Sequence, residues 1–151
     1  MHFWSARPLS RECRGGSLEP YIRKIHYYET DKMGFTHHSN YIRFMEEARI
    51  DFFEKLGKGY REVEEDGVYS PVMSVSCEYK RPTDFGDVLE ITVEPETLKP
   101  MRFTLLYTMK RDGAVVAVGK TEHCFLNRSG KFVNLEKTYP EVWEILREMA
   151  E

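Results

Sequence analysis

Residues 40–56 read NYIRFMEEARIDFFEKL, and this spacing predicts one long helix that ends before Gly57 and Gly59. At 100° per residue, the apolar side chains gather on one side of the helix and cover about half of its circumference. These side chains belong to Tyr41, Ile42, Phe44, Met45, Ala48, Phe52, Phe53 and Leu56. Such a band is broad for a surface helix, so we expect a curved element to wrap around it.

Segments with strand character flank this helix. Residues 21–28, YIRKIHYY, are β-branched and aromatic, which predicts a strand before the helix. Four later segments alternate apolar and polar side chains, as antiparallel strands with one covered face do. They are residues 69–80, 89–94, 102–110 and 114–126. Asp112-Gly113 predicts the last hairpin turn, and further helices are expected at residues 60–66 and 140–149.

The order of these elements indicates a fold class. Strands and helices are segregated along the chain rather than alternating, which favours an α+β domain over a parallel sheet. The simplest packing curls one antiparallel sheet around the long helix. Val115, Val116, Ala117 and Val118 also make the last long strand apolar on both faces. An interface between copies would bury such a strand, so we expect a homo-oligomer, a dimer or a tetramer.

Composition excludes several classes of protein. The chain has 151 residues, of which 41% are hydrophobic and 13% aromatic, enough for one domain with a packed core. A formal net charge of −3 gives no basic balance toward nucleic acid, and no apolar run approaches the roughly 18 residues of a membrane span. We therefore expect a soluble globular protein without nucleic-acid or integral membrane contacts.

The cysteines indicate the cellular compartment, and the N-terminal segment indicates where the domain begins. Cys13, Cys77 and Cys124 form no C-x-x-C pair, and three free thiols fit a reducing compartment. Residues 1–20 lack the apolar core of a secretory signal and are expected to be a flexible leader. The expected single domain therefore covers residues 21–151, and the expected location is the cytoplasm.

Residues 24–41, KIHYYETDKMGFTHHSNY, carry most of the chemistry. Asp31 follows the first strand, Gly34 permits unusual backbone conformations, and His37 and His38 stand at the entrance of the long helix. The unpaired N–H groups of a helix start stabilise negative charge, and a nearby carboxylate can attack a carbonyl or activate water. The residues therefore suit acyl transfer. The alternative is that Asp31 is a turn residue and that His38 caps the helix.

The same segment resembles the active-site signature of the 4-hydroxybenzoyl-CoA thioesterase family of hotdog-fold proteins, especially its bacterial acyl-CoA thioester hydrolase branch. The residues in register with that signature are Ile25, Thr30, Asp31, Gly34, His37, Ser39 and Tyr41. Lys24 stands where Gln or Arg is usual, and Phe35 and Thr36 replace two aliphatic residues. The resemblance covers about residues 21–140 and implies a hotdog fold, in which sheets pair edge to edge.

The resemblance also implies roles for individual residues. Asp31 becomes the nucleophile or general base, and His38 offers its backbone N–H to the oxyanion and its imidazole to water or to the carboxylate. Further residues are expected at the substrate site, namely Tyr28, Thr30, Gly34, His37, Tyr41, Lys80 and Arg81. Of these, Lys80 and Arg81 would meet the phosphates of coenzyme A. Tyr28 could equally be plain core, and Lys80 and Arg81 could simply be solvated.

The expected function is therefore hydrolysis of an acyl-CoA, or of an acyl carrier protein thioester, to a carboxylic acid and a thiol. Because a thiolate leaves easily, the reaction requires neither a metal nor a redox cofactor. The histidines form no recognisable metal pattern, and the serines lack the G-x-S-x-G elbow of serine hydrolases. Two alternatives stay open: a hotdog-fold hydratase or dehydratase, and a non-catalytic acyl-CoA binding module.

Overall fold

The computed structural model describes residues 18–150, so residues 1–17 of the expected leader lie outside the described part of the chain. The elements of residues 18–150 follow one another in a fixed order. They are β1 (Tyr21–Lys24), the 3-10 helix η2 (Tyr27–Glu29), α1 (Ser39–Lys55), α2 (Tyr60–Glu65), β2 (Val68–Tyr69), β3 (Val72–Tyr79), β4 (Val88–Leu98), β5 (Arg102–Arg111), β6 (Ala114–Cys124), β7 (Leu126–Asn127), α3 (Leu135–Thr138) and α4 (Pro140–Ala150).

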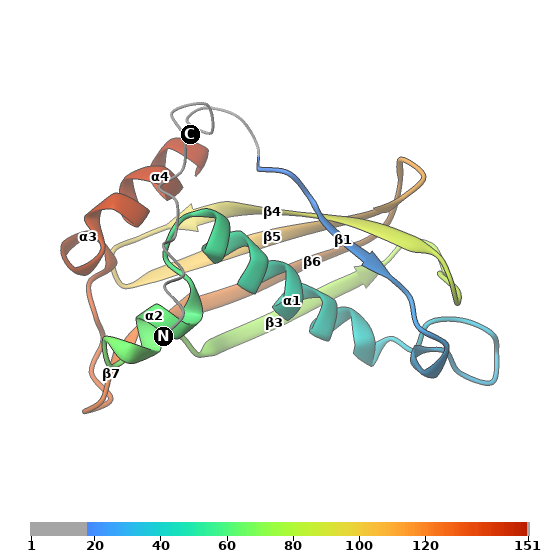
Figure 1. Ribbon diagram of the computed structural model, residues 1–151, viewed down its shortest axis with the longest axis horizontal. Helices are drawn as coiled ribbons and strands as arrows, with labels where there is room; N and C mark the ends of the chain where they lie inside the picture. The colour runs from blue at the N-terminus through green and yellow to red at the C-terminus, as the bar shows by residue number, and fades with distance from the viewer. Residues whose placement is uncertain (1–17, 151) are drawn as a thin grey trace, which may run out of the picture.

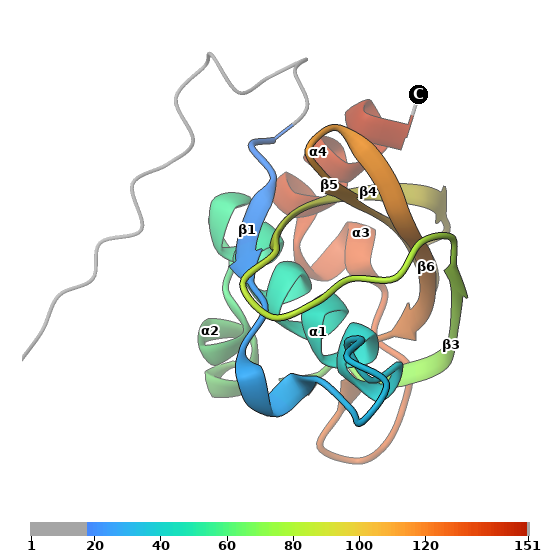
Figure 2. The same cartoon turned by 90° about the vertical axis from the view of Figure 1, so that its right-hand side faces the viewer.

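Five strands form one antiparallel sheet in the order β1-β4-β5-β6-β3. The sheet curls around α1, as the end-on view in Figure 2 shows, while α3 and α4 lie beyond the C-terminal end of α1 in Figure 1. Asp112 and Gly113 make the predicted tight turn between β5 and β6, both with positive φ. The expected α+β architecture, an antiparallel sheet wrapped around one long helix, is confirmed, and β2 and β7 pair as a separate two-stranded sheet.

The core lies between α1 and the concave face of the sheet. Phe44, Met45 and Ala48 of α1 are at most 1% exposed. They face an equally buried set from the sheet, which consists of Leu89, Ile91, Phe103, Leu105, Tyr107 and Met109. Gly119 of β6 allows a close approach of the helix, because a Cβ atom there would lie 2.5 Å from the Met45 sulfur. The helix therefore sits directly on the sheet.

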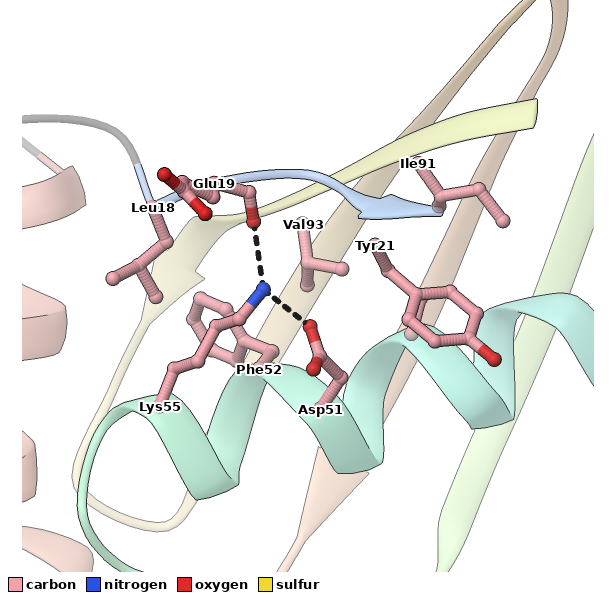
Figure 3. Close-up of a pocket in the computed structure, with 9 residues that line it drawn as sticks. Leu18, Glu19, Tyr21, Asp51, Phe52, Lys55, Ile91 and Val93 are labelled. Carbon is pink, nitrogen blue, oxygen red and sulfur yellow. Dashed lines mark hydrogen bonds and ion pairs between the residues drawn. The ribbon is translucent and has the colours of Figure 1, made fainter. Parts of the chain in front are cut away.

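Residues just before β1 also contact the rest of the described chain. Leu18 packs against the core, and the Glu19 carbonyl accepts a hydrogen bond of 2.9 Å from Lys55 Nζ. Lys55 also pairs with Asp51, and these residues border a small recess beside α1 (Figure 3).

Two expected strands are shorter than the sequence pattern suggested. The strand expected at residues 21–28 stops at Lys24, because the Glu29 carboxylate accepts a hydrogen bond from the His26 N–H and the chain turns into η2. The strand expected at residues 69–80 breaks at Ser70 and Pro71, where proline offers no N–H to a ladder. The four-residue helix α3 was not expected.

The prediction that every strand has a covered face is wrong for β3. This strand lies at the free edge of the sheet, and seven of its eight residues are exposed. Val72, Met73, Val75 and Tyr79 are between 40% and 48% exposed. By contrast, β6 lies between β5 and β3, with Val116 and Ala117 fully buried and its neighbours half-buried. The exposed apolar strand of the described chain is therefore β3, not β6.

None of the helices in residues 18–150 combines the length and hydropathy needed to cross a bilayer.

Candidate active site

The segment between η2 and α1 folds back on itself and forms a short loop, residues 31–38. The Asp31 N–H donates to the Phe35 carbonyl at 2.9 Å, and the Gly34 N–H donates to the Asp31 carbonyl at 3.0 Å. Gly34 closes this turn with φ of +81°, a conformation that a side chain would strain. The half-buried Asp31 carboxylate accepts a hydrogen bond of 2.9 Å from the Met33 N–H, and thus keeps a fixed orientation.

His38 begins the helix at the other end of this loop. Its backbone is already helical, with φ of −56° and ψ of −28°, and its carbonyl accepts a hydrogen bond of 3.3 Å from the Tyr41 N–H. Within residues 18–150 the His38 N–H donates no hydrogen bond. It is an unpaired donor at the positive end of a 17-residue helix, which is where an oxyanion is stabilised.

The two histidine rings lie side by side on the surface. Their centroids are 4.2 Å apart, and His37 Nδ1 lies 2.8 Å from the Ser39 hydroxyl. The His38 ring also meets the ring of Tyr79 edge to face, and the Tyr79 hydroxyl donates to the His38 carbonyl at 3.1 Å. The last residue of β3 therefore touches the start of α1.

A buried ion pair supports the loop from η2. The Glu29 carboxylate is only 3% exposed and accepts hydrogen bonds from Arg23 Nη1 at 2.6 Å, from Nη2 at 2.7 Å and from the His26 N–H at 2.7 Å. Burial alone would raise the pKa of Glu29, but these hydrogen bonds outweigh it and hold that pKa below its usual range. Arg23 also reaches Glu47 of α1 and stacks over the Phe44 ring.

A chain of buried hydroxyl groups supports the loop from its other side. The Tyr41 hydroxyl lies 2.7 Å from Thr83 Oγ1, which donates to Thr36 Oγ1 at 2.8 Å. The Thr36 N–H in turn donates to the Thr83 carbonyl at 2.8 Å. Tyr41 was expected at the substrate site, but it is only 3% exposed, so its hydroxyl links the helix start to the segment between β3 and β4. Burial raises the pKa of Tyr41.

The remaining predicted site residues lie around this loop. The Thr30 hydroxyl donates to the Tyr27 carbonyl at 2.7 Å. Tyr28 is 78% exposed and stacks on the His26 ring, so the alternative that Tyr28 is plain core is wrong. Lys80 pairs with Glu78 at 2.7 Å, whereas the neighbouring Arg81 is exposed and has no acidic partner within residues 18–150.

The structure brings the predicted catalytic residues into one loop without joining them directly. No hydrogen bond connects the Asp31 carboxylate to His37 or His38 in the described chain. The loop presents the Asp31 carboxylate at one end and an unpaired N–H, that of His38, at the other end, seven positions later in the sequence. None of the predicted site residues lines the recess of Figure 3. The chemistry that this pairing suits is attack on an activated carbonyl.

Sequence reasoning missed three residues that hold this loop: Glu29, Asn40 and Thr83. The Asn40 amide nitrogen lies 2.9 Å from the Glu29 carbonyl oxygen and 3.2 Å from that of His37. Asparagine is favoured at the N-cap of a helix, but Asn40 is the second residue of α1, so this preference gave no signal for it. Glu29 and Thr83 form hydrogen bonds with residues on other elements, and no local sequence pattern predicts such contacts.

A second polar cluster lies inside the core, away from the loop. Arg49 is 6% exposed and donates to the Tyr60 hydroxyl at 2.7 Å and to the Tyr107 hydroxyl at 3.1 Å. Within residues 18–150, Arg49 pairs with these hydroxyl groups and not with a carboxylate. Thr121 extends the cluster to His123, whose pKa is lowered to about 3 by burial and by the Arg49 charge. No group of three potential metal ligands occurs in residues 18–150.

Comparison with known proteins assigns this arrangement to a family. Residues 25–145 match the family model described as thioesterase-like superfamily. The 1,4-dihydroxy-2-naphthoyl-CoA hydrolase of Thermosynechococcus vestitus is 32% identical over 72% of this chain and 76% of its own length. Assignment to the bacterial acyl-CoA thioester hydrolase branch of the 4-hydroxybenzoyl-CoA thioesterase family stays a prediction.

Solved structures agree with this match. The crystal structure of a hypothetical protein from Aquifex aeolicus has a TM-score of 0.77 at 36% identity, covering 82% of this chain and 97% of that one. The DHNA-CoA thioesterase of Staphylococcus aureus has a TM-score of 0.81 at 27% identity, covering 86% and 89%. The sheet wrapped around α1 is the hotdog fold, and the chain belongs to the thioesterase-like superfamily.

Proposed function

We propose that the protein hydrolyses acyl-CoA thioesters to a carboxylic acid and free coenzyme A. The observation that carries this proposal is the unpaired His38 N–H at the start of α1, in the same loop as the fixed Asp31 carboxylate. Relatives described as CoA-ester hydrolases and thioesterases support the same reaction class. An acyl carrier protein thioester would offer the same reacting group and is the alternative substrate.

Asp31 acts on the thioester carbonyl carbon. As a nucleophile, its carboxylate forms an acyl anhydride and expels the coenzyme A thiolate, and water then cleaves the anhydride to the acid. As a general base, it takes a proton from water, which attacks the carbonyl directly, and the tetrahedral intermediate then expels the coenzyme A thiolate to leave the acid. In both routes the carbonyl oxygen gains negative charge, and the His38 N–H is the donor that stabilises this charge.

The other residues of the proposed site hold or orient the substrate. Gly34 shapes the turn, and the rings of Tyr28, His37 and His38 are exposed beside it. Arg81, which has no acidic partner within residues 18–150, is the better candidate than Lys80 for the coenzyme A phosphates. The buried Tyr41 supports the start of α1 through its hydroxyl and does not bind the substrate directly.

We further propose that two copies pair along β3, and that two such pairs form a tetramer. The exposed apolar residues of this edge strand and its contact with the helix start through Tyr79 support the pairing. The free thiols of Cys77 and Cys124 fit the cytoplasm.

Two measurements test the proposed reaction: thiol release from acetyl-, hexanoyl-, palmitoyl- and benzoyl-CoA, and the absorbance of a separate enoyl-CoA. Hydrolysis releases a thiol that a colorimetric reagent detects, a hydratase changes only the absorbance of an enoyl-CoA, and a binding module does neither. We expect thiol release from at least one ester. Activity on an enoyl-CoA alone, or binding without turnover, would contradict the proposal.

Substitution of Asp31 tests the proposed mechanism. Asp31→Asn keeps an oxygen that can accept the hydrogen bond from Met33, so the loop should persist while kcat falls by roughly 10²-fold or more. The matched control is Asp84→Asn, because Asp84 also accepts a backbone hydrogen bond, from Phe85. His38→Ala should be milder, since alanine keeps the N–H. Near-normal kcat in Asp31→Asn together with an inactive His38→Ala would favour a histidine-based reaction.

A further inference from the structure

We propose that Asn40 is a positioning residue, which aims the His38 N–H at the carbonyl oxygen of the substrate. This inference rests on the proposed function, because it gives that N–H the role of oxyanion donor. Asn40 would join the residues that the reaction requires without contacting the substrate.

The argument starts from the peptide group that carries the donor. The His38 N–H and the His37 carbonyl belong to one planar trans peptide, so they point in opposite directions. Whatever fixes the His37 oxygen therefore also fixes the direction of the His38 N–H. Asn40 holds this oxygen twice, through its backbone N–H at 3.0 Å and its side-chain amide at 3.2 Å.

The same side chain also fixes the peptide group before this one. Asn40 Nδ2 donates to the Glu29 carbonyl at 2.9 Å, and this oxygen also accepts the His37 N–H at 2.8 Å. Both hydrogen atoms of the Asn40 amide are therefore used on carbonyl groups. Because only the nitrogen end of an amide can donate to two carbonyl oxygens, the orientation of this side chain is unambiguous.

Burial makes this arrangement rigid and keeps Asn40 away from the substrate. Asn40 is 7% exposed, and its partner Glu29 is 3% exposed and anchored by Arg23. Water competes poorly for hydrogen bonds in such a place, and a lost donor would leave buried carbonyl groups unpaired. Asn40 thus acts on the reaction through the peptide plane alone.

The matched variants are Asn40→Asp and Asn40→Ala, with Asn134→Ala as the control. Asn40→Asp keeps the shape of the side chain but replaces the donor with a carboxylate that repels both carbonyl oxygens. Asn134 caps α3 by accepting a hydrogen bond from the Lys137 N–H, so its removal costs stability far from the loop. Each variant is assayed at least 15 °C below its melting temperature, with the best of the four CoA esters.

We expect both Asn40 variants to lower kcat by roughly 10-fold, less than the 10² to 10³ typical of a deleted oxyanion donor, while KM stays within about 3-fold. Asn134→Ala should keep the wild-type kcat. Relative to wild type, kcat of Asn40→Asp should recover as the pH falls from 7 toward 5, because a protonated carboxyl group donates again. A kcat within twofold of wild type in folded Asn40→Asp, or an equal loss in Asn134→Ala, would overturn the proposal.

A measurement without turnover separates this inference from the proposed function. The backbone order parameter of the His38 N–H, from ¹⁵N relaxation, should be near 0.85 in the wild type and clearly lower in both Asn40 variants. It should not change in Asn134→Ala. An unchanged order parameter in Asn40→Asp would refute the positioning role even if no CoA ester is hydrolysed.

Discussion

Lys80 and Arg81 are adjacent cations at the end of β3, yet they meet different surroundings. Both backbone N–H groups donate to the Val116 carbonyl, so the backbone is fixed at this point. The Lys80 ammonium is already paired with Glu78, whereas Arg81 is exposed without an acidic partner in the described chain. A phosphate would therefore compete with an existing ion pair at Lys80 but not at Arg81.

This difference predicts a selective effect on substrate binding. Arg81→Gln should raise KM for an acyl-CoA roughly 5-fold, equivalent to about 1 kcal/mol for an exposed charge pair, with kcat unchanged. Lys80→Gln should change KM less. The same acyl group on N-acetylcysteamine lacks the phosphates, so steady-state kinetics with this thioester should show equal KM for all three proteins. An equal rise with both thioesters would mean that Arg81 shapes the site rather than binding phosphate.

Individual residues differed in how well the sequence predicted them. The Asp31 turn followed from an acid, a nearby glycine and the register before the helix. The burial of Arg49 could not be predicted, because Tyr60 and Tyr107 lie on other elements and satisfy its guanidinium only after folding. Tyr28 is exposed for a related reason, since η2 turns it away from the sheet that a continued strand would have joined.

The contact between α1 and β6 depends on a single missing side chain, at Gly119. A methyl group there would lie 2.5 Å from Met45 Sδ and 2.8 Å from Met45 Cε, and Met45 is fully buried. We expect Gly119→Ala to lower the free energy of unfolding by about 1–3 kcal/mol, the usual range for overpacking, in urea denaturation at fixed protein concentration. Gly59→Ala is the control, because its new methyl would meet only the flexible Glu54 side chain.

A double substitution tests whether the loss of stability in Gly119→Ala comes from a steric clash with Met45. Met45→Ala alone should cost about 2–5 kcal/mol through the cavity that it leaves, but the methyl of Gly119→Ala would occupy part of that cavity. The double variant should therefore lose less than the sum of the two single losses. Additive losses would mean that the two positions do not compete for space.

The elements predicted best were those in which apolar residues recur with a regular period. The expected helix at residues 40–56 differs from α1 by one residue at each end, because the apolar band marks the helix directly. Side-chain interactions set the limits of the first strand and of β3, where Glu29 and Pro71 intervene. The position of β3 at the sheet edge follows from the order of the strands in the sheet. The alternation of apolar and polar residues within one strand does not reveal that order.

At the scale of the whole molecule, the two edges of the sheet are unequal. β1 has four residues, whereas β3 has eight, most of them exposed and several apolar. A long free strand of this kind pairs readily with another strand unless charges or proline block it. The proposed pairing of two copies therefore uses β3.

A charge on this edge should prevent the pairing. Val75→Lys places an ammonium on β3, and the control Val88→Lys places one at a comparably exposed valine of β4, which pairs with β1 and β5. In light scattering at micromolar concentration, the wild type and Val88→Lys should have the mass of at least a dimer, and Val75→Lys should be monomeric with reduced kcat. A fully active wild-type monomer would exclude the proposed assembly.

The contact between Tyr79 and His38 has a consequence for the working enzyme. Tyr79 is the last residue of the strand that we expect to pair, and its hydroxyl donates to the carbonyl of the residue that begins α1. Association of two chains would then act directly on the geometry of the loop. By mass action, the rate per chain would fall on dilution below the dissociation constant and recover on concentration, so the abundance of the protein in the cell would itself regulate its activity.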